Sequence, residues 1–255
     1  MHYVNSTHKI YLLVILAFSS MAKMYGIEFY GDEIQVTVSK NAVVVNDWIL
    51  ETVQLHRRRH HKLVVGLDIE WLPCFNPDEN HPVALLQLCV GRRCLLFQLL
   101  HRDGVPAYLA EFLVDSNVKF VGVGVEGDAE KLLRDHKLFV SNTVDLNRLA
   151  LSVYGEEVYG KMGLKRMAKE VLGKVMEKPK NVTLSKWDAE ELVYEQVEYA
   201  AIDAFMSFEI GKTLLNLVWK RERERQYLNC HYQPPPLLLL QHTQGMFQTF
   251  ALFSV

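Results

Sequence analysis

The chain has 255 residues, a formal net charge of −2 and a hydrophobic share of 49%. This composition is enough for one sizeable globular core and excludes a disordered chain. It also excludes a global basic field, so any contact with nucleic acid has to be local. The four cysteines form no C-x-x-C pair and no cluster with histidines at zinc spacing, which excludes a zinc-finger site and favours a reduced, intracellular chain.

The two ends of the chain differ from its middle. Residues 10–18 (IYLLVILAF) are an apolar run, too short to cross a bilayer but long enough for the apolar part of a secretory signal. We expect residues 1–24 to be an extension without a structural role and the protein to reside in the nucleus or cytoplasm; a cleaved signal and secretion are the alternative. The proline-rich, leucine-rich residues 221–255 are expected to be a disordered tail. Residues 25–220 then carry the fold.

The first half of this region predicts mainly strands. Residues 26–39 (GIEFYGDEIQVTVS) read as two short strands around Gly31-Asp32. Asn46 is a suitable N-cap for a helix that ends in the basic residues 56–62 (HRRRHHK). Three strand-like runs follow, at residues 63–70, 83–90 and 94–99. Only three residues separate the last two runs, so we expect these to form an antiparallel hairpin.

In the second half, helices alternate with strands. We expect helices at residues 105–114, 128–136, 147–154, 164–172 and 188–219, and strands at residues 120–125 and 143–146. Three antiparallel strands followed by alternating helices and parallel strands predict an α/β fold, with a mixed sheet flanked by helices on both faces.

The run LVVGLDIEW, residues 63–71, places two carboxylates in an otherwise apolar strand. Strand side chains alternate, so Asp68 and Glu70 share a face with Gly66. Carboxylates this close raise each other's pKa, and a divalent cation with oxygen ligands would relieve the repulsion. An edge strand with a solvated polar face explains the pattern equally well, so the strand alone leaves both alternatives open.

Two further acidic positions come from helices. Tyr199 and Asp203 are four residues apart in EQVEYAAIDAF and therefore share a helical face. The alanines around Asp203 allow a close approach to another element, and a buried Asp is costly unless it is a ligand; a surface Asp on an amphipathic helix is the alternative. Asp128 follows the strand FVGVGV and, taken alone, is an ordinary acid at a helix start.

The order D-x-E, then D, then Y-x-x-x-D resembles the DEDD-type 3′-5′ exonucleases of the ribonuclease H-like fold, in the subgroup with a tyrosine in the third motif. VVGLDIEW resembles the first motif and VGVGVEGDAEKL the second. LSKWDAEELVYEQVEYAAIDAFMSFEIG resembles the third, including Trp187, although the residue before Trp187 departs from the expected Asp. The resemblance is closest to the exonuclease domain of the Werner syndrome protein and its stand-alone plant relatives, and it covers about residues 25–219.

The resemblance implies a ribonuclease H-like fold and a 3′-5′ exonuclease that acts on DNA or RNA 3′ ends and releases nucleoside 5′-monophosphates. It implies that Asp68, Glu70, Asp128 and Asp203 hold two divalent cations, Mg²⁺ or Mn²⁺, and that Tyr199 orients the attacking water. No membrane association is expected. The alternative is a catalytically weak protein on the same fold that binds nucleic acid or regulates a partner.

Contacts with nucleic acid have weaker support in the sequence. Arg57, Arg58 and Arg59 either bind backbone phosphates or form a solvated helix end of suitable charge. Trp71, directly after the strand acids, either stacks on a terminal base or packs in the core.

Overall fold

The computed structural model describes residues 21–76 and 78–231. The apolar run at residues 10–18 lies outside the described residues, as does the proline-rich part of the C-terminal stretch. Among the described helices, none combines the length and the apolar character needed to cross a membrane. The described residues up to Val218 form one compact unit, and those from Trp219 onward form a second.

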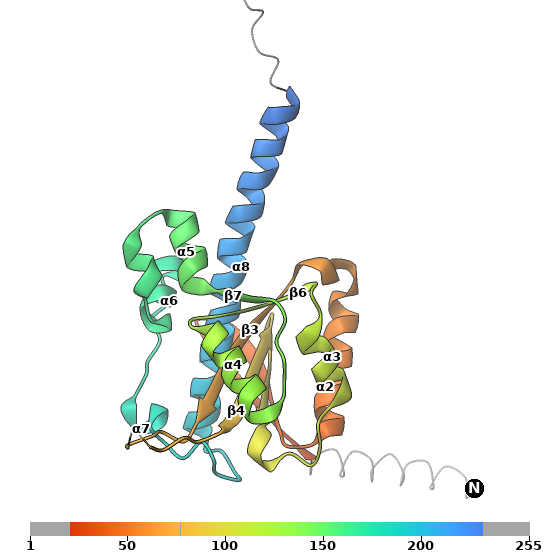
Figure 1. The fold of residues 1–255 in the computed structure, drawn as a ribbon, viewed down its shortest axis with the longest axis vertical. Helices are drawn as coiled ribbons and strands as arrows, with labels where there is room; N and C mark the ends of the chain where they lie inside the picture. Colours follow the sequence, from red (N-terminus) through yellow and green to blue (C-terminus); the bar gives the residue numbers. More distant parts are fainter. Residues whose placement is uncertain (1–20, 77, 232–255) are drawn as a thin grey trace, which may run out of the picture. The chain divides into compact units, whose positions relative to one another are not determined.

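A seven-stranded mixed sheet forms the centre of the first unit (Figure 1). Its strands are β1 (Ala22–Phe29), β2 (Asp32–Ser39), β3 (Leu63–Trp71), β4 (Val83–Val90), β5 (Arg93–Gln98), β6 (Val118–Gly122) and β7 (Thr143–Asp145). Across the sheet the order is β1-β2-β5-β4-β3-β6-β7. β4 pairs antiparallel with both β3 and β5, whereas β6 pairs parallel with β3 and with β7. The predicted sequence of antiparallel strands followed by parallel ones is confirmed.

Helices cover both faces of this sheet. They are α2 (Ala42–His56), α3 (Ala107–Val114), α4 (Val125–His136), α5 (Leu146–Tyr154), α6 (Leu164–Leu172), α7 (Lys180–Thr183) and α8 (Tyr194–His231), with 3₁₀ turns η1 (Arg57–Lys62), η2 (Leu99–His101) and η3 (Glu157–Lys161). One apolar cluster joins α2, α3 and α4 to the face of β3 that carries Leu63, Val65, Leu67 and Ile69. α8 packs on the other face, where its backbone meets Gly66. The predicted α/β class is therefore confirmed.

The first helix begins earlier than predicted. Asn41, rather than Asn46, is its N-cap, and the Asn41 side chain accepts hydrogen bonds from the backbone N–H groups of Val43 and Val44. The Asn46 side chain accepts from the N–H of Tyr108 instead and so ties the helix to α3. Asparagine suits an N-cap at either position, but only Asn41 makes the local capping bonds, whereas Asn46 makes a tertiary contact.

The turn between β6 and α4 also falls earlier than predicted. β6 ends at Gly122 and α4 begins at Val125, so the strand expected at residues 120–125 is wrong at both ends. Gly124 has a φ of 75°, a left-handed conformation that favours glycine, and its N–H donates to Asp145. This sharp turn keeps Asp128 in the first turn of α4, as predicted.

The last helix both begins and ends later than predicted. At its start, Gln196 accepts a hydrogen bond from the N–H of Val193, which is half of a capping box. The segment before it is a loop, in which the carbonyls of Ala189 and Glu190 accept hydrogen bonds from the Gln98 side chain. Residues 221–231, which the sequence assigns to the disordered tail, are helical, and residues 22–24, which it assigns to the extension without a structural role, lie in β1.

The cysteine prediction is wrong for one pair. Cys89 and Cys94 lie directly opposite each other in β4 and β5 and form a disulfide. Cys74 is exposed and free.

Candidate active site

The close contact between β3 and α8 brings the site together. A Cβ atom added at Gly66 would lie 2.0 Å from the carbonyl oxygen of Ala204, so strand and helix touch through their backbones. Asp68 and Glu70 share the Gly66 face of β3, and Asp203 lies next to Ala204 on α8. The close approach predicted from the glycine and the alanines is therefore present, and it places the third-motif acid against the strand acids.

A cavity of about 270 Å³ opens at the carboxyl end of β3. It is lined by Asp68, Ile69, Glu70, Trp71, Pro73, Val123, Asp128, Thr183 and Leu184. Three of the four predicted acids thus reach one cavity from two elements far apart in sequence. Asp203 and Tyr199 are not part of its lining.

Asp203 lies behind these acids, with only 1% of its side chain exposed. Its Oδ2 accepts a hydrogen bond from the ammonium of Lys178 at 2.5 Å. The same ammonium donates to the hydroxyl of Tyr199 at 3.2 Å. The other oxygen of Asp203, Oδ1, is buried and has no hydrogen-bond partner. A buried carboxylate oxygen without a partner is costly, so this atom is suited to an added ligand.

Lys178 is the site residue that the sequence reasoning missed. It lies between α6 and α7 in the polar segment KVMEKPKNV, directly before Pro179, and nothing in its spacing distinguishes it from the lysines around it. Burial alone lowers the pKa of Lys178, but attraction to Asp203, and then to Asp68 and Glu70, outweighs burial and raises it above its ordinary value. Lys178 is therefore a cation at neutral pH.

Burial is the main cause of the raised carboxyl pKa values in the site. Burial, and then the charges of Asp68 and Asp203, together raise the pKa of Glu70 to about 9. Burial raises the pKa of Asp68 well above the ordinary value, again with help from neighbouring acids. The pKa of Asp128 rises to about 7. Without an added cation, the site therefore resists full ionisation.

Burial also raises the pKa of Asp203, although Lys178 opposes the shift. Among the described residues, no three Asp, Glu, His or Cys side chains converge as a ready-made metal cage. The acids nevertheless lie close enough to affect one another's ionisation, and carboxylate oxygens are the ligands that Mg²⁺ and Mn²⁺ prefer. With an unpartnered oxygen on Asp203, the residues fit a divalent cation.

The pKa of Glu70 predicts a pH-dependent gain in stability for Glu70→Gln in EDTA. Below about pH 4.5, Glu70 carries its proton in both the folded and the unfolded wild type. The free energies of unfolding of wild type and Glu70→Gln should therefore be equal there. As the pH rises toward 9, only the unfolded wild type loses that proton, and folding becomes less favourable. Glu70→Gln should then be more stable by roughly 1–3 kcal/mol at pH 8. Urea unfolding at pH 4.5 and pH 8 measures this, and an equal difference at both pH values would contradict it.

Tyr199 lies beside Asp203 and Lys178, and its ring packs near that of Trp187. Burial, and then the charges of Asp203 and Glu70, raise the pKa of its hydroxyl above the ordinary value, so the phenol is neutral. The ring lies 5.9 Å from the ring of Trp187, whose indole N–H donates to the carbonyl of Thr183. Trp187 is buried and so fixes the start of α8 against α7.

Trp71 has features of both predicted roles. Its ring packs against the apolar cluster, and the ammonium of Lys131 lies 5.2 Å from the ring centre. It also lines the cavity beside Glu70. A contact with a terminal base stays a prediction.

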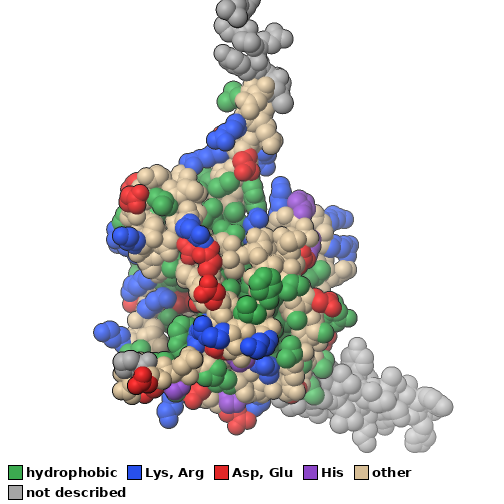
Figure 2. All heavy atoms as spheres, viewed as in Figure 1, with side chains coloured by type: hydrophobic (Ala, Val, Ile, Leu, Met, Phe, Trp, Pro, Cys, Tyr) green, Lys and Arg blue, Asp and Glu red, His purple; other side chains and the backbone are tan. Residues whose placement is uncertain are grey.

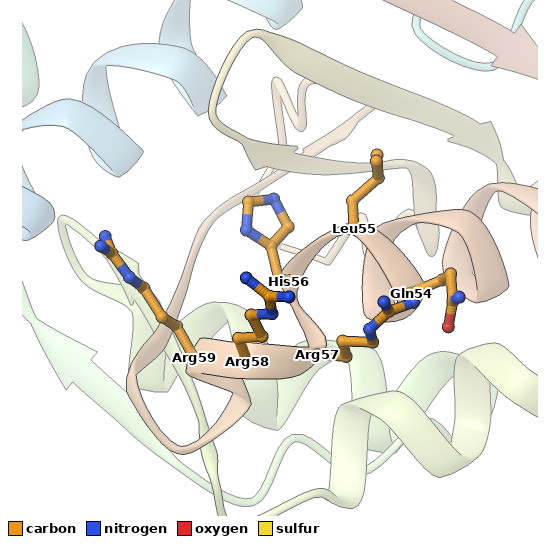
Figure 3. A pocket seen from close by; sticks show the side chains of 6 residues that line it. All are labelled: Gln54, Leu55, His56, Arg57, Arg58 and Arg59. Atoms are coloured by element: carbon orange, nitrogen blue, oxygen red, sulfur yellow. The ribbon is translucent and has the colours of Figure 1, made fainter.

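Arg57, Arg58 and Arg59 do not reach the acids. They lie in η1, directly before the amino end of β3, whereas Asp68 and Glu70 lie near its carboxyl end, about 17–23 Å further along the strand. They line a separate hollow of about 560 Å³ and their side chains point in different directions (Figure 3). On the face shown in Figure 2, basic and acidic side chains are interspersed rather than gathered into one basic field. A nucleic-acid contact at these arginines stays a prediction.

Comparison with known proteins supports the motif assignment. A family model described as 3′-5′ exonuclease matches residues 40–219. The mouse bifunctional 3′-5′ exonuclease/ATP-dependent helicase WRN is 37% identical over 156 residues, which cover 60% of this chain and 11% of that protein. A 3′-5′ exonuclease of Arabidopsis thaliana is 31% identical over 188 residues, which cover 72% of this chain and 64% of that protein. The chain therefore spans about a tenth of the mouse relative and somewhat less than two thirds of the plant one.

Solved structures share the fold. Escherichia coli RNase D superposes with a TM-score of 0.59 at 18% identity, covering 75% of this chain and 47% of that one. The EXO domain of Aedes aegypti Nibbler gives a TM-score of 0.56 at 18% identity, and the match covers 76% of this chain and 93% of that one. The family match contains every candidate acid, Tyr199 and Lys178. The chain therefore belongs to the 3′-5′ exonuclease family.

Proposed function

We propose that this protein is a metal-dependent 3′-5′ exonuclease that removes nucleoside 5′-monophosphates from the 3′ ends of nucleic acids. The observation that carries the proposal is the cavity that Asp68, Glu70 and Asp128 line from β3 and α4, with Asp203 of α8 close enough to affect the ionisation of Asp68 and Glu70. Carboxylates repel a phosphate backbone unless cations stand between them. A protein that only binds nucleic acid has no use for four of them here, so the cluster favours catalysis.

Members of the family depend on divalent metal ions, and the donor set of this chain suits them. Asp68, Glu70, Asp128 and Asp203 would hold the ions, for which we propose a pair of Mg²⁺ or Mn²⁺. When bound, such a pair activates water and stabilises the departing 3′ oxygen. The neutral hydroxyl of Tyr199 can hold the attacking water in line but is too basic to take its proton by default.

End-labelled substrates test the proposal. With Mg²⁺ or Mn²⁺, a 3′-labelled strand should release its label at once as a mononucleotide, and a 5′-labelled strand should shorten step by step. EDTA should stop both reactions. Parallel assays on DNA, RNA, single strands and recessed duplexes identify the preferred 3′ end. Binding without any cleavage in either ion would favour the alternative, a protein that binds nucleic acid or regulates a partner.

We predict that Asp128→Asn retains more activity than Asp68→Asn. Asp128 reaches the cavity from the first turn of α4, whereas Asp68 lies close enough to both Asp203 and Asp128 for each to raise its pKa. Asp68 should therefore contribute to both ions and Asp128 to one. Initial rates on a labelled single strand at saturating Mg²⁺ give the ranking, and the reverse order would contradict this geometry.

The three arginines of η1 give a prediction about substrate length. If Arg57, Arg58 and Arg59 bind backbone phosphates, replacing all three by Gln should weaken binding of a long strand and reduce its salt dependence. A dinucleotide is too short to span the roughly 17–23 Å from the acids to η1, so its turnover should not change. Salt-dependent binding of a 20-mer, measured beside turnover of the dinucleotide, separates a phosphate contact at η1 from an effect on the acids. Unchanged binding of the 20-mer would leave these arginines as a solvated helix end.

A further inference from the structure

Lys178 already occupies the position of a counterion among the acids. Its ammonium bonds to Asp203 and to Tyr199, two of the five candidate site residues, and lies 5.3 Å from the centre of the Tyr199 ring. Its side chain is 30% exposed, whereas that of Asp203 is 1% exposed. The lysine therefore approaches from the solvent side and covers one oxygen of a carboxylate that is otherwise sealed.

The backbone around Lys178 fixes this approach. Pro179 follows it as the N-cap of α7, with φ at −69°, and restricts the residue before it to extended conformations. Lys178 thus reaches Asp203 from a held position, while its four-carbon side chain can still swing aside.

We propose that Lys178 is a built-in substitute cation, which holds Asp203 while no metal is bound and competes with the divalent ion for that carboxylate. The inference rests on the proposed function, because it needs the acids to be metal ligands. It explains why these acids lie close together without forming a preformed cage among the described residues. It also explains why Asp203 keeps one partnered oxygen and one unpartnered oxygen. The ammonium satisfies one oxygen and leaves the second without a partner.

Competition makes a prediction opposite to that of a purely structural lysine. Lys178→Met keeps a side chain of similar length but removes its charge. A divalent ion then neither competes with the ammonium for Asp203 nor is repelled by it. The variant should bind Mn²⁺ at least about tenfold more tightly than wild type. A lysine that only supports the fold would, when replaced, leave Mn²⁺ affinity unchanged or weaken it through a misplaced Asp203.

Lys174→Met is the matched control. Lys174 lies in the same segment and is comparably buried, but it pairs with Asp32 at 3.1 Å, away from the four acids. Its loss should not change Mn²⁺ affinity. Lys178→Arg keeps the charge and should stay close to wild type.

The experiment is a calorimetric titration of Mn²⁺ into the full chain without nucleic acid, for wild type, Lys178→Met, Lys178→Arg, Lys174→Met and Asp68→Ala. Tighter binding in Lys178→Met alone is the expected result; unchanged or weaker binding in it overturns the inference. If wild type binds no more Mn²⁺ than Asp68→Ala, the proposed metal site itself has failed, which is a distinguishable outcome.

If Lys178→Met does not fold, wild type decides the question by nitrogen-15 NMR of the lysine ammonium groups, with Lys178→Arg to assign the resonance. In EDTA, the Lys178 ammonium protons should exchange slowly with water because they are hydrogen-bonded. Saturating Mg²⁺ should release them and speed their exchange. Protection that is unchanged by Mg²⁺ overturns the inference.

Discussion

Asp68→Ala and Asp203→Ala are each expected to abolish nuclease activity, by at least about 10³-fold, while the chain still folds. Asp68 lies on the Gly66 face of β3 and its pKa is raised by burial, by Asp203 and by Asp128, so its carboxylate interacts with both of these acids. Asp203 is sealed beneath it and offers an unpartnered oxygen. Without either acid, the proposed pair of ions loses a central ligand.

The two variants should differ in stability when EDTA is present. Asp68→Ala removes a repelling carboxyl group, so its stability should equal or exceed that of wild type. Asp203→Ala leaves the ammonium of Lys178 without its carboxylate partner and should cost roughly 1–3 kcal/mol. Thermal melts measure the stability of both variants, and the end-labelled assay measures their nuclease activity. Asp188→Ala, an exposed acid near the start of α8, is the control and should behave like wild type. Near-normal turnover in either site variant would remove that acid from the mechanism.

The parts of the fold that follow a local repeat could be predicted from the sequence. Alternation along Leu63–Glu70 places the apolar residues in the core and both acids on the opposite face, and the structure shows that arrangement. The small residues Gly66 and Ala204 predict a close approach of strand and helix, and the backbone contact is present. Of the four acids picked out by their order along the chain, Asp68, Glu70 and Asp128 line the cavity.

What could not be predicted depends on contacts between distant residues. Asn41 and Asn46 are equally good caps in isolation, and only the bond from Tyr108 to Asn46 assigns them. The loop before α8 accepts hydrogen bonds from Gln98, which lies in a remote strand. Lys178 is one lysine among several in a polar loop, and its importance comes from the chain fold that directs it at Asp203. A long flexible side chain can reach a site from many loop positions, so its spacing carries no information.

Tyr199→Phe is the other variant with a large expected effect, a fall in kcat of roughly 10–10³-fold, the range for losing one positioned proton-handling group. The substitution removes only the hydroxyl, and the packing of the ring beside Trp187 remains. Burial and the nearby acids keep that hydroxyl neutral, so its role is to hold the attacking water by hydrogen bonding rather than to deprotonate it. Loss of that hold should lower kcat and leave strand binding almost unchanged.

The same helix supplies a matched control in Tyr194→Phe, because Tyr194 is exposed at the start of α8, away from the acids. Single-turnover rates and strand affinity of both variants should be measured from pH 6 to pH 9. Metal affinity of Tyr199→Phe should hold, because all four carboxylates remain. The hydroxyl also accepts a hydrogen bond from Lys178, so a modest loss of thermal stability in EDTA is expected beside the loss of rate. If Tyr199→Phe matched Tyr194→Phe in rate at every pH, Tyr199 would be a packing residue of α8, and the attacking water would have to be oriented by other groups at the cavity.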